Sequence, residues 1–287
     1  MNTNTLRITV AACCMAGSLQ ANAVVISAAG VDVASITGSR DAFRVTLGGG
    51  TTAGANGSFG GVRREINWDG VAAGFSAPNN LPANFFNSNS PRGVVFSTPG
   101  TGFAVSGATT DAGVGQPAAA NFGNINASYT STFLPFTAQR LFTPLGSNIM
   151  DVNFFVAGTG TAATVGGFGA IFSDVDFSNT TSIQYFDAGN TSLGTFFTPG
   201  LFGSQTFSFL GVSFNAGERI GRVRITTGNT TLGAGVTDNG DNIDVVVMDD
   251  FLFSEPTAGG VPEPGTVVSM LSGLGVLAFG FRRSRKS

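Results

Sequence analysis

The side chains of this sequence that could do chemistry are mainly aspartates. Asp174 and Asp176 fall on one candidate strand, and Asp249 and Asp250 stand side by side in the last one. Strict alternation puts Asp249 on the same apolar face as Phe251, where a carboxylate requires an Arg, backbone amides or a metal as its partner. Oxygen ligands suit calcium, so we hypothesise one calcium ion bound by the four aspartates. Hydrogen bonding in turns is the alternative, and no other cofactor is predicted.

Other catalytic chemistries are excluded by composition. The chain of 287 residues has no His, and its lysine lies at position 286. A Ser-His-Asp triad, a His-ligated metal and a P-loop or Schiff-base lysine are therefore excluded. A carboxylate pair could still hydrolyse a glycosidic bond. The glutamates are few, however, and no spacing singles out an acid and a nucleophile, so we predict a non-enzymatic protein and keep a glycan hydrolase as the alternative.

The aromatic residues favour a core over a binding surface. The sequence contains 27 Phe but one Trp and two Tyr, whereas exposed sugar platforms are usually built from Trp and Tyr. The Phe side chains are expected to fill the core. Trp68, between Asn67 and Asp69, is the candidate ligand platform, with buried packing as its alternative interpretation.

The elements that must position these residues are predicted to be β-strands. Short segments with period-two alternation are separated by Gly, Asn, Ser and Pro, and almost no helical periodicity is present. Arg222 to Thr226 is the clearest strand, and Ser182 to Phe197 predicts a hairpin. Phe43 to Leu47 is another candidate strand, and a change of parity within Phe207 to Phe214 predicts a β-bulge near Leu210. We therefore expect an all-β, antiparallel, jelly-roll-like β-sandwich over residues 24–255, most regular over 147–255.

The N-terminus is typical of a secretory signal peptide. One Arg, the apolar run from Ile8 to Leu19 and a small-x-small exit at Ala21 and Ala23 predict a signal helix over residues 1–23, with cleavage after Ala23. Both cysteines, Cys13 and Cys14, would leave with it. The exported body would then fold without a disulfide.

The C-terminus has a second targeting pattern after a linker at residues 256–260. It combines an extended Pro-Glu-Pro segment, a short apolar run and a basic end, which together predict a short transmembrane helix with its basic end in the cytoplasm. The residues that define the pattern are Val261, Pro262, Glu263, Pro264, Arg282, Arg283 and Arg285.

This tail, residues 261–287, resembles the PEP-CTERM sorting signal of exported bacterial proteins. The resemblance implies processing by exosortase, a membrane protease, and transient anchoring in the inner membrane before release to the cell surface or extracellular matrix. A permanent anchor is the alternative. Residues 65–70, 168–193 and 248–251 also resemble a segment common among such exported proteins, which implies no particular activity.

The charge of the predicted body limits its partners. Residues 24–261 contain nine Arg and sixteen acidic side chains, a net charge of −7. Such a surface repels phosphate backbones, so nucleic acid is excluded as a partner. We expect an exported protein with a structural role or with weak affinity for extracellular polysaccharide. A surface adhesin that binds proteins is a further alternative.

Overall fold

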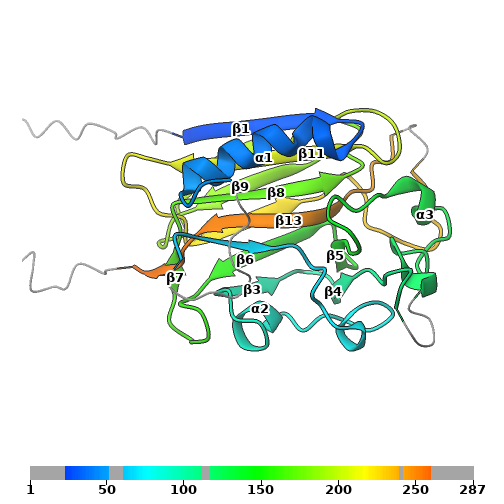
Figure 1. Ribbon diagram of the computed structural model, residues 1–287, viewed down its shortest axis with the longest axis horizontal. Coiled ribbons are helices and arrows are strands. Elements are labelled where there is room, and N and C mark those ends of the chain that lie inside the picture. Colours follow the sequence, from blue (N-terminus) through cyan, green and yellow to red (C-terminus); the bar gives the residue numbers. More distant parts are fainter. Residues whose placement is uncertain (1–22, 52–60, 112–116, 239–241, 260–287) are drawn as a thin grey trace, which may run out of the picture.

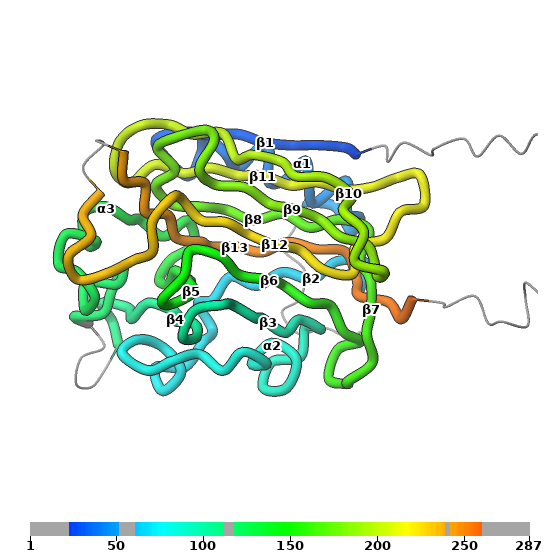
Figure 2. The backbone as a smooth tube through the Cα atoms, turned by 180° about the vertical axis from the view of Figure 1, so that it is seen from behind, coloured from blue at the N-terminus to red at the C-terminus, as the bar shows by residue number. Residues whose placement is uncertain are grey.

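The chain folds mostly into β-strands in antiparallel sheets, as the sequence predicts. The structure is a computed structural model that describes residues 23–51, 61–111, 117–238 and 242–259. All strand pairs in it are antiparallel within these ranges. Figure 1 shows one sheet from the front, and Figure 2 shows the other from behind.

The first sheet has seven strands in the order β1-β11-β8-β13-β5-β4, with β2 also paired to β13. Its strands are β1 (Ala23–Gly30), β2 (Arg63–Ile66), β4 (Gly102–Val105), β5 (Phe142–Leu145), β8 (Gly167–Ser173), β11 (Phe207–Phe214) and β13 (Val247–Ser254). Strands from both halves of the chain therefore hydrogen bond in one sheet.

The second sheet has five strands in the order β10-β9-β12-β6-β3. They are β3 (Val94–Ser97), β6 (Ile149–Phe154), β9 (Ser182–Phe186), β10 (Ser192–Phe197) and β12 (Arg222–Thr226). The predicted hairpin is confirmed as β9 and β10. In β12 the side chains of Val223 and Ile225 are fully buried, as alternation requires.

Smaller elements complete the fold. β7 (Ala163–Thr164) pairs with β14 (Thr257–Ala258), so two residues of the predicted linker lie in a strand pair. The remaining short elements are η1 (Ala73–Phe75), α2 (Phe85–Ser88), η2 (Pro117–Ala119) and α3 (Tyr129–Thr132).

The main core lies between the two sheets. It combines side chains of the first sheet, such as Phe168 and Phe251, with side chains of the second, such as Val152 and Ile183. Most of the buried large residues are Phe, which confirms that the aromatic residues mainly fill the interior. Burial of this apolar surface is the principal favourable term for a body that lacks disulfides in the described ranges.

The helix α1 (Val33–Leu47) was not predicted, and the predicted strand from Phe43 to Leu47 lies within it. Its N-terminus is capped by Asp32, whose side chain accepts a hydrogen bond from the Ser35 amide at 2.8 Å. Its C-terminus is capped by Gly48 at φ 100°, with its N–H directed at the carbonyls of the last turn. Figure 1 shows α1 in front of β1 and β11.

The helix explains why the predicted bulge in β11 is wrong. The register of β11 is continuous with both β1 and β8, and all eight of its residues are buried. Phe207 and Phe209 pack with Ile36 and Phe43 of α1, whereas the alternate side chains enter the core between the sheets. Both parities are apolar because both faces of this strand are covered.

A bulge is present instead in β13, between Met248 and Phe251. The extra residue changes the parity, so Met248 and Phe251 both face the core between the sheets while Leu252 packs beneath α1. The prediction that Asp249 shares a face with Phe251 is therefore wrong. The bulge releases Asp249 from strict alternation and lets its carboxylate reach the loop at Phe136.

Both predicted targeting segments lie outside the described residues, apart from Ala23, which is the first residue of β1. Among the helices described, none is long and apolar enough to cross a membrane. β1 begins, and the described chain ends beyond β14, on the same side of the molecule (Figure 1).

Candidate functional site

The candidate site is built around the turn that follows β2. Trp68 has φ 64°, a left-handed conformation that is unusual for a bulky side chain. The turn is closed by hydrogen bonds from the Asp69 amide to the Asn67 carbonyl and from the Val71 amide to the Trp68 carbonyl, both 2.8 Å. Such backbone strain is common at binding sites, where the surrounding structure holds it in place.

Trp68 is held by packing from every side. Its side chain has 0 % exposed surface, and its ring stacks on Phe142 at 3.9 Å between centroids. Its indole N–H donates a 2.6 Å hydrogen bond to the carbonyl oxygen of Asp249. Two residues that the sequence analysis singled out therefore meet, but Trp68 offers no exposed ring for stacking on a sugar, so the buried interpretation holds.

A pocket of about 370 Å³ lies beside this turn. Its size falls within the range of small-molecule sites, about 300–1,000 Å³. The buried rings of Phe85, Phe86 and Trp68 form its apolar wall. Among its polar residues, Asn89 is exposed to solvent. The residues that line it are Asn67, Trp68, Gly70, Val71, Phe85, Phe86, Asn89, Ser90 and Arg92.

Arg92 supplies the positive charge of the pocket. Its side chain is buried, with 7 % exposed, and its Nε donates a 2.9 Å hydrogen bond to the Glu65 carbonyl. Its Nη1 donates to the carbonyl and to the hydroxyl of Ser90. The guanidinium also lies over the ring of Phe86, 5.2 Å from its centroid. Burial, followed by the charge of Arg64, lowers the pKa of Arg92 to about 10.

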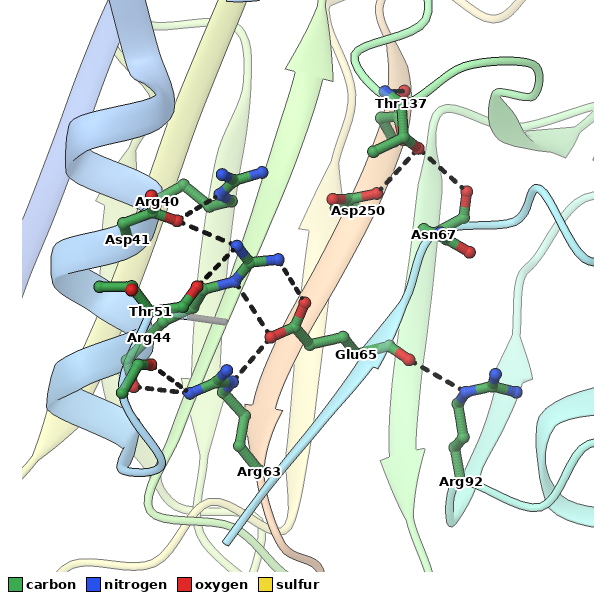
Figure 3. A network of polar contacts seen from close by, with 12 residues as sticks. Arg40, Asp41, Arg44, Thr51, Arg63, Glu65, Asn67, Arg92, Thr137 and Asp250 are labelled. Atoms are coloured by element: carbon green, nitrogen blue, oxygen red, sulfur yellow. Dashed lines mark hydrogen bonds and ion pairs between the residues drawn. The ribbon is translucent and has the colours of Figure 1, made fainter. Parts of the chain in front are cut away.

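The side chain of Glu65 lies on the other side of β2, beneath α1 (Figure 3). Its carboxylate accepts hydrogen bonds from Arg44 at 2.6 Å and 3.1 Å and from Arg63 at 2.7 Å. Arg63 also donates to carbonyl oxygens at the end of α1, including that of Gly48 at 2.5 Å. This cluster joins α1 to the sheet and has no contact with the pocket through its carboxylate.

The aspartate pair at the β13 bulge is bound into the interior. Asp249 accepts hydrogen bonds from the amides of Phe136 at 2.6 Å and Thr137 at 3.3 Å. Burial raises the pKa of Asp249 well above its usual range, with the Asp250 charge as the next cause, and burial raises that of Asp250 to about 6. Both carboxylates also accept from the Thr137 hydroxyl, at 3.2 Å each, so the pair is held against the loop at Phe136 and Thr137.

Asp174 lies elsewhere, beside the Gln205 backbone. It follows β8 at φ 70°, it is 1 % exposed, and neither of its carboxylate oxygens makes a hydrogen bond of normal geometry to the described residues. Burial, followed by the charges of Asp238, Asp176 and Asp244, raises its pKa to about 9. Its neighbours are committed: Asp176 accepts from the Gly203 amide at 2.8 Å, and Asp244 accepts from the hydroxyl of Thr180.

The four aspartates of the calcium hypothesis are thus not brought into one group. Asp249 and Asp250 turn toward Phe136 and Thr137 because of the bulge, whereas Asp174 and Asp176 lie beside Asp244. Within the described ranges no three His, Cys, Asp or Glu side chains are placed so that they could hold a metal ion. A single calcium bound by all four has no support in this arrangement.

The residues of the pocket that the sequence analysis missed are Arg92, Asn67 and Asn89. They come from two segments, one after β2 and one between α2 and β3, and these strands belong to different sheets. One feature of the sequence could have indicated Arg92. It lies two residues before the start of the apolar strand β3. The acidic residues considered for hydrolysis are absent from the lining that the structure describes.

Comparisons with known proteins identify the tail. Residues 260–286 match the family described as the PEP-CTERM protein-sorting motif. The predicted sorting residues from Val261 to Arg285 fall within the match, although they lie outside the described part of the structure. The chain carries this sorting motif at its C-terminus, and the motif indicates export, transient membrane anchoring and processing by exosortase.

The other comparisons add little. The search of curated proteins found no match to this chain. Among solved structures, a mutant of a family 29 carbohydrate-binding module aligns with 11 % identity over 56 % of this chain and 96 % of its own, with a TM-score of 0.24.

Proposed function

We propose that this exported protein is a non-enzymatic β-sandwich that binds extracellular polysaccharide through the pocket beside Trp68. The observation that carries the proposal is a pocket of about 370 Å³ held next to a strained, fully buried Trp. The Trp68 hydrogen bond and its stacking on Phe142 fix the turn, so the polar atoms of Asn67 are presented from a rigid support.

The lining suits a sugar. The side-chain amide of Asn67 makes no hydrogen bond within the described residues, so it remains available to hydroxyl groups of a ligand. Asn89 is exposed at the same pocket, and the largely buried Phe85 and Phe86 form the apolar part of its wall. A few placed polar groups on an apolar wall are the usual composition of a small-molecule site.

Binding is favoured over hydrolysis because of what the lining contains. Glycoside hydrolysis usually needs two carboxyl groups that flank the scissile bond. The described lining of this pocket holds amides, a hydroxyl and a guanidinium, and no carboxyl group. The exosortase signal places such a protein outside the cytoplasm, where polysaccharide is the abundant sugar polymer.

The test is affinity electrophoresis of the exported chain in gels that contain soluble bacterial polysaccharides. We expect retardation in at least one of them. Asn67→Ala should weaken it about tenfold, the equivalent of roughly one lost hydrogen bond. Asn84→Ala is the matched control, because Asn84 is exposed and outside the pocket lining.

Three outcomes would contradict the proposal. Equal migration of the protein in all gels would remove polysaccharide as the ligand. Equal weakening by Asn67→Ala and Asn84→Ala would remove this pocket as the site. Release of reducing sugar from a retarding polysaccharide would favour the hydrolase alternative over simple binding.

A further inference from the structure

The feature that carries a further inference is the unbalanced charge of Arg92. Arg92 is a buried residue, with 7 % of its surface exposed, and its guanidinium lines the pocket. Nε and Nη1 are used in hydrogen bonds to Glu65 and Ser90, and Nη2 has no acceptor among the described residues. A buried charge without an ionic partner is costly, so natural proteins generally pair it.

The other arginines of the described body show how unusual this is. Arg40, Arg44, Arg63, Arg64, Arg140, Arg222 and Arg224 each have a carboxylate within ion-pair distance. Arg219 has no such ion pair, but it is exposed, so water can solvate its charge. Of the nine arginines, Arg92 combines burial with the lack of a carboxylate partner in the described structure.

The carboxylates of Glu65 and Glu255 are held by other arginines. The carboxylate of Glu65 binds Arg44 and Arg63 on the opposite side of β2, as Figure 3 shows, and gives Arg92 its backbone carbonyl alone. The carboxylate of Glu255 is held by Arg64 at 2.5 Å and 2.8 Å. Arg64 in turn adds a second positive charge near Arg92, which is one cause of the lowered pKa of Arg92. No carboxylate of the described residues is therefore within ion-pair distance of Arg92.

We propose that this pocket binds the carboxylate of an acidic sugar, a uronic acid unit of an extracellular polysaccharide. The inference rests on the proposed function, because it names the class of sugar that the same pocket takes. A carboxylate would accept charge-assisted hydrogen bonds from Nη2 of Arg92, which are stronger than bonds between neutral groups. The amide of Asn67 lines the same pocket and can donate to the second carboxylate oxygen or to a ring hydroxyl.

The acidic body does not oppose this contact strongly. The net charge of −7 over residues 24–261 repels an acidic polymer at long range. At physiological ionic strength such repulsion is screened beyond about 8 Å, whereas a contact inside a pocket is screened much less. The affinity for an acidic ligand is therefore set by the local charge of Arg92 rather than by the net charge of the protein.

The experiment is calorimetric titration of the exported chain with two matched oligosaccharides, trigalacturonate and its methyl ester. The ester keeps the rings and hydroxyl groups and lacks the negative charge. We expect the acid to bind at least about tenfold more tightly than the ester, and Arg92→Gln to remove that difference. Arg219→Gln, which removes an exposed arginine without an ion pair, should leave the difference unchanged. Arg92→Lys keeps the charge and should retain part of the preference.

The outcomes separate the two proposals. Equal affinity of acid and ester, with Arg92→Gln unchanged, would overturn acidic-sugar recognition and leave polysaccharide binding standing. No heat with either sugar, combined with no retardation in the polysaccharide gels, would overturn both. Competition by inorganic sulfate as strong as that by trigalacturonate would also overturn the inference, because the pocket would then select an anion and not a sugar acid. If Arg92→Gln fails to fold, loss of the acid preference in Asn67→Ala with the preference kept in Asn84→Ala is the expected substitute result.

Discussion

Buried arginines on the two sides of β2 differ in whether they have a carboxylate partner. On the side beneath α1, one carboxylate, that of Glu65, is shared by Arg44 and Arg63. On the pocket side, Arg92 receives a carbonyl oxygen and a hydroxyl but no carboxylate. Both places are buried, so both pay the desolvation of a charge. The first cluster pairs its charges within the protein, whereas Arg92 has no carboxylate partner among the described residues, which is the basis of the proposed acidic ligand.

The largest effect should come from breaking the complete cluster. Glu65→Gln keeps the shape of the side chain but leaves Arg44 and Arg63 buried without their carboxylate. We expect the free energy of unfolding to fall by about 3–5 kcal/mol, the usual cost of removing one partner of a buried pair. Urea denaturation measures it. Glu255→Gln is the matched control, since the Glu255 side chain is 22 % exposed, and a loss as large there would contradict the comparison.

Asp174 extends the comparison to an unpaired carboxylate. Its pKa is raised from 3.8 to about 9, so between these pH values the folded state keeps a proton that the unfolded state has lost. The contribution of Asp174 to the free energy of unfolding is therefore greatest below about pH 4, and it falls as the pH rises toward 9. Asp174→Asn has no such proton to hold and should raise stability by about 2–4 kcal/mol at pH 7. Asn also tolerates the left-handed backbone at this position.

The measurement is the denaturation midpoint of both proteins from pH 4 to pH 9. The gain from Asp174→Asn should grow steadily with pH and be small at pH 4. A gain that does not change with pH would mean that the carboxylate is ionised in the folded protein. Asp187→Asn is the matched control, because Asp187 lies in the exposed turn between β9 and β10 and accepts a hydrogen bond from the Thr191 amide.

Removing Arg92 should have a smaller effect on stability. Arg92→Gln loses hydrogen bonds to Glu65 and Ser90 but also relieves an unpaired buried charge. We expect a change of about 1 kcal/mol or less, since these two contributions oppose each other. Thermal melting without ligand measures it. A loss as large as that of Glu65→Gln would mean that Arg92 is structural, which would remove the contrast between the two sides of β2.

The smallest effect is expected at the exposed ion pair of Arg224 and Asp151. The Arg224 side chain is 44 % exposed and lies 2.8 Å from the Asp151 carboxylate. Arg224→Gln should change the free energy of unfolding by about 0.5 kcal/mol, because exposed pairs gain little over water. The loss should become undetectable in 1 M salt, as measured by urea denaturation. If the loss remained in 1 M salt, the pair would not be a solvent-exposed ion pair that salt can screen.

The sequence predicted the strands that have one buried face. Arg222 to Thr226 alternates between Arg and apolar residues, and each Arg lies on the outer face while Val223 and Ile225 are buried. This pattern is local, because successive side chains of a strand point to opposite faces. Strands with two buried faces were harder to interpret. Phe207 to Phe214 has no alternation to detect, since one face packs on α1 and the other on the second sheet.

The pocket could not be predicted because its two lining segments follow β2 and precede β3, which lie in different sheets and meet only in the tertiary structure. Arg92 is separated from Glu65 by 27 positions, and Asp249 is separated from Trp68 by 181. The helix α1 was missed for a related reason. Its buried residues are Ile36, Phe43 and Arg44, so its apolar face is short and includes a charge that the cluster with Glu65 neutralises.

The sequence by itself determined the targeting of this protein and the β character of its body. The sorting tail is recognised as a linear segment, and period-two alternation is a property of neighbouring residues. The tertiary structure alone decided which charges are paired. Whether Arg92, Asp174 or Glu65 is neutralised depends on distances between segments far apart in the chain, and the energy of a buried charge depends on those distances and on its burial.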